Sequence, residues 1–567
     1  MNSILPKDAQ DDEVPQWNRL AECKRQAQND SIPKEWRLPP DHPIPGNPYE
    51  YLKTSGLLTP EEVHITEHTE AKILVHRMIS HQLTAEEVVT AFCKRAALAQ
   101  QLIKCCTEMF FDNAIEQARS LDRHFETTGR PVGPLHGLPI SLKDVFDVEG
   151  QDTTWGWVSL IGKPAHRNCP LVEILISQGA VPYVKTNVSQ SLMVRSNTFL
   201  ECMRGAVWIS NSLSQMTDSY NHIFKQSLHS HNTTFTSGGS SGGEGALVGC
   251  RGSILGIGTD IGGSVRFPAN IQGLYGLFPT VPRIPLDDSS KREFLVNPAA
   301  GPVASSLGSI EFFMDSLAKG QPELYDPACG PLPWSWDLAK SPQKPLKIGY
   351  YTYDGHVRVQ PPIEAAVLDV VEALRKAGHD VVEWDCSSHG KAYQMWEQAM
   401  FADGGSKCRQ LTESSGEPLL EELILQQSKT EYQRNYMRRW REAGLDALIT
   451  PVQPWVSFKP KVWAQSKQYL GYTAHWNLCN FAALTIPVTT AMAKSPSLEK
   501  VMSSWQNYKP RNESDQFNWE NFDPELIRGM PVGIQIIGGH YGEEKAVATA
   551  KAVEADLGRE GPKAFPF

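Results

Sequence analysis

In the C-terminal half of the chain, some apolar runs have the pattern of a β-strand and others have the spacing of an α-helix. The run LKIGYY at 346–351 is strand-like, residues 363–377 place apolar side chains at helical spacing, and DVVEWD at 380–385 is strand-like again. Near the end, PVGIQIIG at 531–538 precedes a helix-like run at 541–558. Strand, helix and strand in succession indicate a βαβ unit. The pattern therefore predicts an α/β protein.

The first 130 residues follow a helical pattern. Thr59 and Thr84 each precede a helix-favouring run and are each followed three residues later by a glutamate, which is the capping-box arrangement of a helix N-terminus. We interpret residues 1–70 as an N-terminal helical extension and residues 71–567 as a single α/β domain.

The middle of the chain, from about 131 to 310, is rich in glycine and serine. Apolar, strand-like runs such as GLPISLKDVFDV at 137–148 and GAVPYVKT at 179–186 are interleaved with it. This mixture predicts loops held by a buried sheet.

Composition narrows the classes of function. The chain has 567 residues, 41% of them hydrophobic, with a net charge of −10 and no basic stripe. This argues against a nucleic-acid partner. No segment approaches the roughly 20 apolar residues of a membrane-spanning helix, and the N-terminus does not resemble a secretory signal. Eleven cysteines without CxxC pairs fit a reduced protein, so we expect a cytoplasmic location.

Residues 236–280, TSGGSSGGEGALVGCRGSILGIGTDIGGSVRFPANIQGLYGLFPT, carry the strongest chemical signal. Dense glycine lets backbone amides approach a ligand closely, and a helix predicted to open at Glu244 places its positive end beside the loop. The segment is suited to an anion, either bound or formed during a reaction.

This segment also allows other interpretations. Plain turns or linkers explain a bare GGSSGG, but linkers do not alternate with buried strands. No GKS or GKT follows the glycines, which excludes a phosphate-binding P-loop, and GIGTDIGG has the wrong spacing for a dinucleotide fingerprint. Gly238 to Gly242 match GxSxG, the nucleophile elbow of esterases, with Ser240 as nucleophile. That elbow needs a preceding buried strand, and HSHNTTFTS at 229–237 makes a poor one.

Three motifs in order resemble the amidase signature family. They are GLPISLKDVFDVEG at 137–150, GGSSGGEGAL at 238–247 and GTDIGGSVRFPA at 258–269, with Ser240 and Ser264 lying 24 positions apart. VKTNV at 184–188, YGLFPT at 275–280 and, more weakly, GMPVGIQIIG near the C-terminus match as well. The resemblance implies the amidase-signature fold, a central mixed, twisted β-sheet surrounded by α-helices.

The resemblance also implies a Ser-Ser-Lys triad. Ser264 is the expected nucleophile, Ser240 the bridging serine after a cis peptide bond, and Lys143 the base. Backbone N–H groups of Ile261, Gly262, Gly263 and Ser264 are the expected oxyanion hole.

The predicted chemistry requires a neutral lysine. An ammonium group cannot take the proton of a serine hydroxyl, and burial favours the uncharged amine. The apolar neighbours of Lys143 indicate that its side chain points into the protein. We expect Asp260 and Arg266 to brace the loop structurally, and His222, His229 and His231 to be surface residues rather than metal ligands. No metal and no organic cofactor are expected.

An insertion interrupts the family pattern between Met193 and Thr217. Removing the 22 residues from Val194 to Gln215 restores continuity, and the codons for Val-Arg and Gln can supply the GT and AG borders of an intron. A retained intron and a genuine surface loop both stay open. At Ile223-Phe224-Lys225 the chain has lysine where the family usually has glycine.

These observations predict an amidase that converts a small-molecule amide to a carboxylate and ammonia or an amine through an acyl-serine intermediate. The organisation resembles fungal acetamidase-like members. The alternatives are a catalytically impaired or binding paralogue, because of the insertion at 194–215, and an esterase that uses Ser240. A homodimer is left open.

Overall fold

A mixed sheet of 11 strands forms the centre of the protein. The computed structural model describes residues 15–190, 217–286, 296–401, 420–462 and 469–558. The predicted insertion at 194–215 lies outside these residues. In spatial order the strands are β1 Cys106–Met109, β3 Val181–Thr186, β2 Pro139–Lys143, β6 Leu255–Asp260, β8 Ala299–Ala304, β7 Tyr275–Phe278, β12 Ala482–Thr490, β13 Pro531–Gly539, β11 Ala447–Thr450, β9 Lys347–Tyr350 and β10 Asp380–Glu383.

The strand directions bring the predicted motifs to one edge of the sheet. Strand β2 runs parallel to β6, with Ser141 opposite Gly256 and Leu142 opposite Ile257. The carboxyl ends of parallel strands lie at the same edge. Lys143, at the end of β2, and Asp260, at the end of β6, are therefore placed on a common side.

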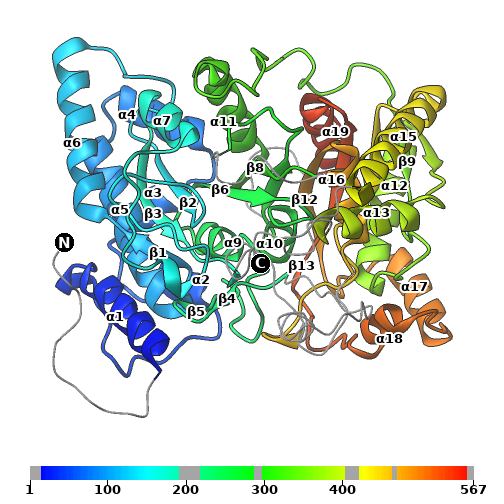
Figure 1. The fold of residues 1–567 in the computed structure, drawn as a ribbon, viewed down its shortest axis with the longest axis horizontal. Coiled ribbons are helices and arrows are strands. Elements are labelled where there is room, and N and C mark those ends of the chain that lie inside the picture. The colour runs from blue at the N-terminus through cyan, green and yellow to red at the C-terminus, as the bar shows by residue number, and fades with distance from the viewer. Residues whose placement is uncertain (1–14, 191–216, 287–295, 402–419, 463–468, 559–567) are drawn as a thin grey trace.

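Helices surround the sheet (Figure 1). The helices are α1 Gln16–Asp30, α2 Pro48–Thr54, α3 Pro60–Thr66, α4 Ala71–Ile79, α5 Ala85–Ile103, α6 Phe111–Thr128, α7 Pro170–Ser177, α9 Gly242–Gly249, α10 Arg266–Gln272, α11 Leu307–Lys319, α12 Pro361–Lys376, α13 His389–Phe401, α15 Leu420–Ala443, α16 Gly471–Cys479, α17 Pro496–Gln506, α18 Glu513–Glu520 and α19 Glu543–Asp556. Short 3-10 turns lie at Lys34–Trp36, Val158–Leu160 and Pro322–Leu324, and β4 Tyr220–Asn221 pairs with β5 Lys225–Gln226.

The local predictions for the helical and βαβ segments are confirmed, except that strand β1 lies within the first 130 residues. Both capping boxes form, at Thr59 before α3 and at Thr84 before α5. Strand β9, helix α12 and strand β10 follow one another, and the two strands pair in parallel. Strand β13 and helix α19 give the predicted C-terminal pair.

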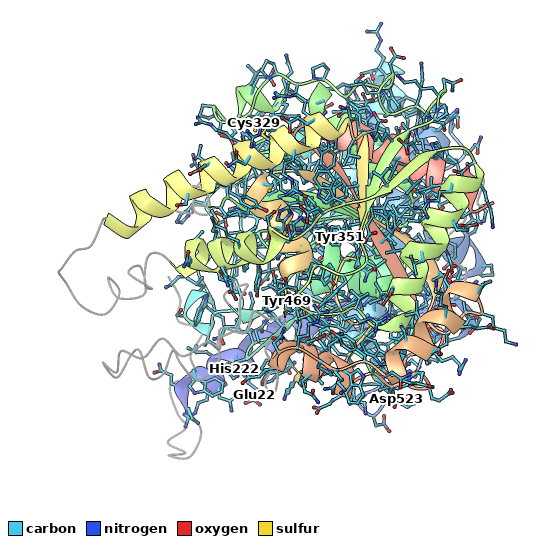
Figure 2. All side chains as sticks on the ribbon, turned by 90° about the vertical axis from the view of Figure 1, so that its right-hand side faces the viewer. Glu22, His222, Cys329, Tyr351, Tyr469 and Asp523 are labelled. Carbon is cyan, nitrogen blue, oxygen red and sulfur yellow. The ribbon has the colours of Figure 1, made fainter. Side chains whose placement is uncertain are left out.

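A large apolar core fills the space between the sheet and its helices. It extends in sequence from Ile32 to Val553. Figure 2 shows Tyr351 inside the mass of side chains and Asp523 at its rim. The division of the chain at residue 70 stays a prediction. Among the described residues, each helix is too short or too polar to span a membrane.

Candidate active site

Lys143 lies at the buried edge of the sheet and contacts the glycine-serine loop. Its side chain is fully buried. The Nζ atom donates to Ser240 Oγ at 2.8 Å and to Thr259 Oγ1 at 2.8 Å. The structure therefore joins two residues that lie 97 positions apart in the chain.

Burial favours the uncharged form of the Lys143 amine near pH 7. It lowers the pKa of this lysine from 10.5 to about 7, although the negative charges of Asp260 and Glu244 act in the opposite direction. With a pKa near 7, the Lys143 amine is neutral in a large fraction of the molecules at physiological pH, and the neutral amine has a free lone pair. This is the property that a general base needs.

Ser240 is held in a crowded turn immediately before α9. The peptide bond between Gly239 and Ser240 is cis, as the family resemblance predicts. A Cβ atom at Gly239 would overlap the backbone of Asp218, so glycine is required there. Helix α9 begins at Gly242, two residues before the predicted opening at Glu244. Gly242 and Gly243 pack so closely against Ser219 and Asn187 that a side chain would overlap them.

The strand that an esterase elbow requires is missing before Ser240. Residues 229–239 contain no strand, and an isolated bridge joins Leu228 to Thr236. The GxSxG match at Gly238 to Gly242 therefore lacks the structural context of a nucleophile elbow.

The loop that follows β6 is braced by the carboxylate of Asp260. Its Oδ1 accepts the amide of Gly263 at 2.7 Å, and its Oδ2 accepts the amide of Val265 at 3.1 Å. Arg266 lies 3.0 Å from the same carboxylate, and both side chains are fully buried. Burial alone would raise the pKa of Asp260, but the charge of Arg266 and the hydrogen bonds from Arg266, Asn477 and the Val265 amide together hold the pKa below its usual 3.8.

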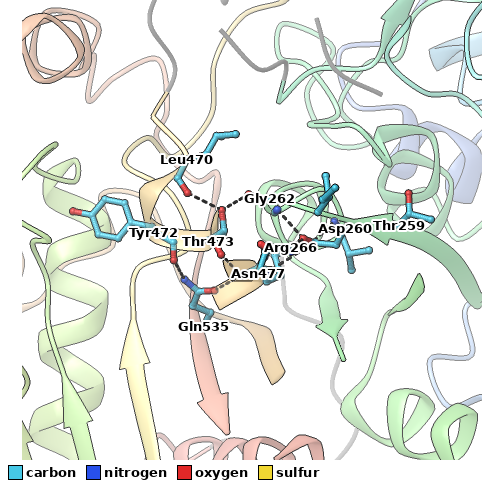
Figure 3. A network of polar contacts seen from close by, with 12 residues as sticks. Thr259, Asp260, Gly262, Arg266, Leu470, Tyr472, Thr473, Asn477 and Gln535 are labelled. Carbon is cyan, nitrogen blue, oxygen red and sulfur yellow. Dashed lines mark hydrogen bonds and ion pairs between the residues drawn. The ribbon is translucent and has the colours of Figure 1, made fainter. Parts of the chain in front are cut away.

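A wider polar network fixes Arg266 in turn (Figure 3). Its guanidinium donates to Asn477 Oδ1 at 2.6 Å, to the Thr473 carbonyl at 3.1 Å and to Gln535 Oε1 at 3.2 Å. Asn477 Nδ2 donates back to Asp260 at 2.9 Å. The predicted bracing roles of Asp260 and Arg266 agree with these contacts. No local motif marks Thr473 or Asn477, and Gln535 lies in the GMPVGIQIIG run, for which the sequence predicted no role at the site.

The amides of the loop differ in their availability. That of Gly263 is engaged by Asp260. Among the described residues, no acceptor takes the amides of Ile261, Gly262 or Ser264. Three of the four predicted oxyanion donors are therefore free for a ligand.

Ser264 is half-buried at the end of this loop. Its carbonyl oxygen accepts the amide of Ser241 at 3.2 Å, which ties the loop to the turn that holds Ser240. Within the described residues, the hydroxyl of Ser264 makes no hydrogen bond to a protein group. The side chains of Lys143 and Ser240 are thus joined by a hydrogen bond, and Ser264 is linked to the Ser240 turn by a backbone hydrogen bond.

Buried charges beside Lys143 have their own partners. Lys185 pairs with Asp144 at 3.0 Å, and both are fully buried. Glu244 accepts from Ser141 Oγ at 2.6 Å and from Thr186 Oγ1 at 2.8 Å, and burial raises its pKa to about 7. Lys143, by contrast, has only hydroxyl and carbonyl oxygens as described partners.

The structure contains a cavity of about 240 Å³. Val281, Ile284, Asn477 and Asn480 are among the residues that line it. Since Asn477 also binds Asp260 and Arg266, the cavity adjoins the network that braces the loop.

The prediction for His229 is wrong. This residue is fully buried, with the His231 amide donating to Nδ1 at 3.0 Å and with Nε2 2.9 Å from the Ile271 carbonyl. Burial lowers its pKa to about 4, so the ring stays neutral. Two backbone partners offset the cost of burial, and these cannot be seen in the sequence. His222 and His231 are half-buried. Among the described residues, no group of three or more His, Cys, Asp or Glu side chains could hold a metal ion.

Lys225, which replaces the family glycine, has a left-handed backbone with φ of 69°. This conformation costs a residue with a Cβ atom about 1–2 kcal/mol. We expect Lys225→Gly to raise the free energy of unfolding by about 0.5–1 kcal/mol, because glycine relieves the strain but gains freedom when unfolded. Urea titration measures this free energy of unfolding. Lys347→Gly, in strand β9, is the matched control and should lose stability. Equal losses in both variants would contradict the prediction.

Comparisons with known proteins identify the family of the chain. A sequence model of the amidase family, described as Amidase, matches residues 87–547. The acetamidase of Emericella nidulans is 36% identical, covering 96% of this chain and 99% of its own length, and that of Aspergillus oryzae is 35% identical over the same shares. A solved structure of fatty acid amide hydrolase matches with a TM-score of 0.83 and 31% identity, covering 96% of this chain and 95% of that one. The chain therefore belongs to the amidase signature family of amide hydrolases.

Proposed function

We propose that this protein hydrolyses carboxylic amides with Ser264 as nucleophile, Ser240 as proton relay and Lys143 as base. The observation that carries this proposal is the hydrogen bond from a fully buried Lys143 to Ser240. A lysine with a pKa of about 7 accepts a proton at physiological pH, which an ordinary lysine cannot do.

The reaction proceeds in two stages. Ser264 Oγ attacks the amide carbonyl carbon while its proton passes to Ser240 and the proton of Ser240 passes to Lys143. The protonated Lys143 returns a proton through Ser240 to the departing nitrogen, the C–N bond breaks, and an ester links the acyl group to Ser264. Water then attacks this ester by the same relay and releases the carboxylate.

The loop amides stabilise the charge that forms on the carbonyl oxygen. Those of Ile261, Gly262 and Ser264 are available, and Asp260 engages that of Gly263. Fixed donors of this kind lower the barrier because they need no reorganisation during the reaction.

Small aliphatic or aromatic primary amides are the proposed substrates. The similarity to two fungal acetamidases over nearly the whole chain supports this class. The fatty acid amide hydrolase structure favours a panel that also includes long acyl amides.

A cytoplasmic location is also proposed. Eleven cysteines without a CxxC pair fit a reducing compartment. The net charge of −10 supports a small-molecule rather than a nucleic-acid partner. The homodimer stays a prediction, and size-exclusion chromatography measures the oligomeric state.

A chain that lacks residues 194–215 is expected to fold as well as the full chain and to hydrolyse amides at least as fast. The described flanks are already joined, because Asn221 Nδ2 donates to Asn187 Oδ1 at 2.7 Å and to the Val188 carbonyl at 2.8 Å. Turnover of an amide panel and the melting temperature of both purified chains measure this. Ser264→Ala in the shortened chain is the control for contaminating activity.

The outcomes separate the alternatives. Activity in the shortened chain alone indicates an impaired full-length form, and sequencing of the mature transcript then tests the retained intron. A shortened chain that unfolds at lower temperature than an active full chain makes the segment an integral loop. Two folded chains that turn over no amide contradict the proposed function.

A further inference from the structure

Two helices from distant parts of the chain bind the carbonyl groups of the loop after β6. Trp396, on α13, donates its indole N–H to the Ile261 carbonyl at 2.9 Å. Thr473, on α16, donates its hydroxyl to the Gly262 carbonyl at 2.5 Å. These donors lie 135 and 211 positions away from the groups that they bind.

The hydrogen bond of Trp396 also sets the direction of an amide. The C=O of Ile261 and the N–H of Gly262 belong to one planar peptide unit. Cis bonds occur in the described chain at Gly239-Ser240 and Val281-Pro282, so this unit is trans. Its C=O and N–H point in opposite directions. A donor that holds the Ile261 oxygen therefore aims the Gly262 amide away from α13.

The two neighbouring peptide units have other anchors. Between Gly262 and Gly263, Thr473 holds the carbonyl and Asp260 holds the amide. Between Gly263 and Ser264, the Phe267 amide holds the carbonyl at 2.7 Å. Among the described residues, Trp396 is the group that binds the peptide unit between Ile261 and Gly262. Glycine offers little resistance to rotation of such a unit, so the external donor decides its orientation.

The indole itself is rigidly placed. Trp396 is fully buried, and its ring stacks on Tyr393 with centroids 6.0 Å apart and an interplanar angle of 11°. Helix α13 packs on α16, where His389 and His475 stack with centroids 3.8 Å apart. A side chain held in this way transmits the position of α13 to the loop.

We propose that Trp396 is a positioning residue that aims the Gly262 amide at the oxyanion. The inference rests on the proposed function, because it assigns a role in that reaction. Trp396 acts through the Ile261 carbonyl and does not touch the substrate.

The test replaces Trp396 with phenylalanine, which removes the donor and keeps an aromatic ring. We expect kcat for an amide to fall roughly 10- to 100-fold, because one oxyanion donor loses its aim. KM should stay within about twofold, since ground-state binding does not need that donor. The affinity for phenylboronic acid, which forms a tetrahedral adduct with serine, should fall by a similar factor to kcat.

Trp476→Phe is the matched control. Trp476 is equally buried on the adjacent α16, but its indole N–H has no hydrogen-bond partner among the described residues. Its replacement changes packing without removing a donor. We expect this variant to keep kcat within about threefold of the parent, as a change in packing alone leaves the loop amides aimed.

Thr473→Val is a second variant. Its effect should be smaller than that of Trp396→Phe, because Asp260 still holds the same peptide unit.

Each result supports or overturns the inference. A parent-like kcat in Trp396→Phe, or equal losses in Trp396→Phe and Trp476→Phe, overturns it. If Trp396→Phe folds only in part, the ratio of boronate affinity to KM still decides, because neither constant depends on the active fraction. A parent enzyme without turnover contradicts the proposed function instead, and so the two failures are distinguishable.

Discussion

Ser264→Ala is expected to lower kcat for amide hydrolysis by at least about 10⁴-fold. Loss of a serine nucleophile removes the covalent intermediate and leaves only the residual catalysis of the oxyanion hole and of binding. Ser264 is half-buried, and its hydroxyl makes no described hydrogen bond. The melting temperature should therefore change little. Steady-state kinetics with a primary amide measures the loss, and mass mapping after fluorophosphonate treatment locates the labelled serine.

Ser240→Ala separates the amidase from the esterase alternative. In the proposed mechanism Ser240 only relays a proton, so we expect a smaller loss than in Ser264→Ala and continued labelling at Ser264. An active Ser264→Ala together with an inactive Ser240→Ala would instead favour the Ser240 esterase. Equal melting temperatures in both variants exclude unfolding as the cause of any loss.

The triad was predicted from the resemblance to the amidase signature family, whose motifs could be matched because each of the three residues lies beside a buried strand or a glycine-rich turn. Lys143 ends β2, Ser264 follows β6, and Ser240 precedes α9. Such positions have short-range signals: apolar runs, close-packed glycines and a helix start. The parallel pairing of β2 and β6 brings Lys143 and the loop of Ser264 to one edge of the sheet, and the hydrogen bond to Lys143 joins Ser240 to them.

The supporting residues could not be predicted in this way. Trp396, Thr473 and Asn477 bind the loop from helices more than a hundred positions away, and no pattern in α13 or α16 encodes that contact. The sequence shows no cysteine or carboxylate that would complete a metal site with His229, and a surface position was therefore expected. The partners that allow its burial are backbone groups that only the fold brings close. Side chains that act through long-range contacts are thus the part that sequence patterns leave out.

Lys143→Met is expected to abolish turnover, with kcat reduced by about 10³-fold or more, and to make the protein more stable at pH 7. The methionine cannot accept the proton of Ser240, which removes the general base. Burial that lowers the pKa from 10.5 to about 7 costs the folded state about 5 kcal/mol at low pH. Loss of the hydrogen bonds to Ser240 and Thr259 offsets part of this gain. We expect a net increase of about 2 kcal/mol in the free energy of unfolding.

The pH dependence fixes the sign of this effect. Between pH 7 and 10.5 the unfolded lysine binds more protons than the folded one, so the stability of the parent rises with pH in that window. The advantage of Lys143→Met should therefore be largest at pH 7 and below, and should shrink toward pH 10.5. Because the neutral amine is the base, kcat/KM of the parent should rise with pH through the pKa of about 7 and level off roughly one pH unit above it. Urea titrations and rate profiles between pH 6 and 10 measure both.

Lys185→Met supplies the matched control on the neighbouring strand β3. Lys185 is as buried as Lys143, but it pairs with Asp144 at 3.0 Å. Removing it leaves a buried carboxylate without its cation, which costs about 3–5 kcal/mol. The same substitution on adjacent strands is thus expected to stabilise at one position and destabilise at the other. A Lys143→Met variant that loses stability at pH 7, or a parent with a flat rate profile, would show that Lys143 is charged and is not the base.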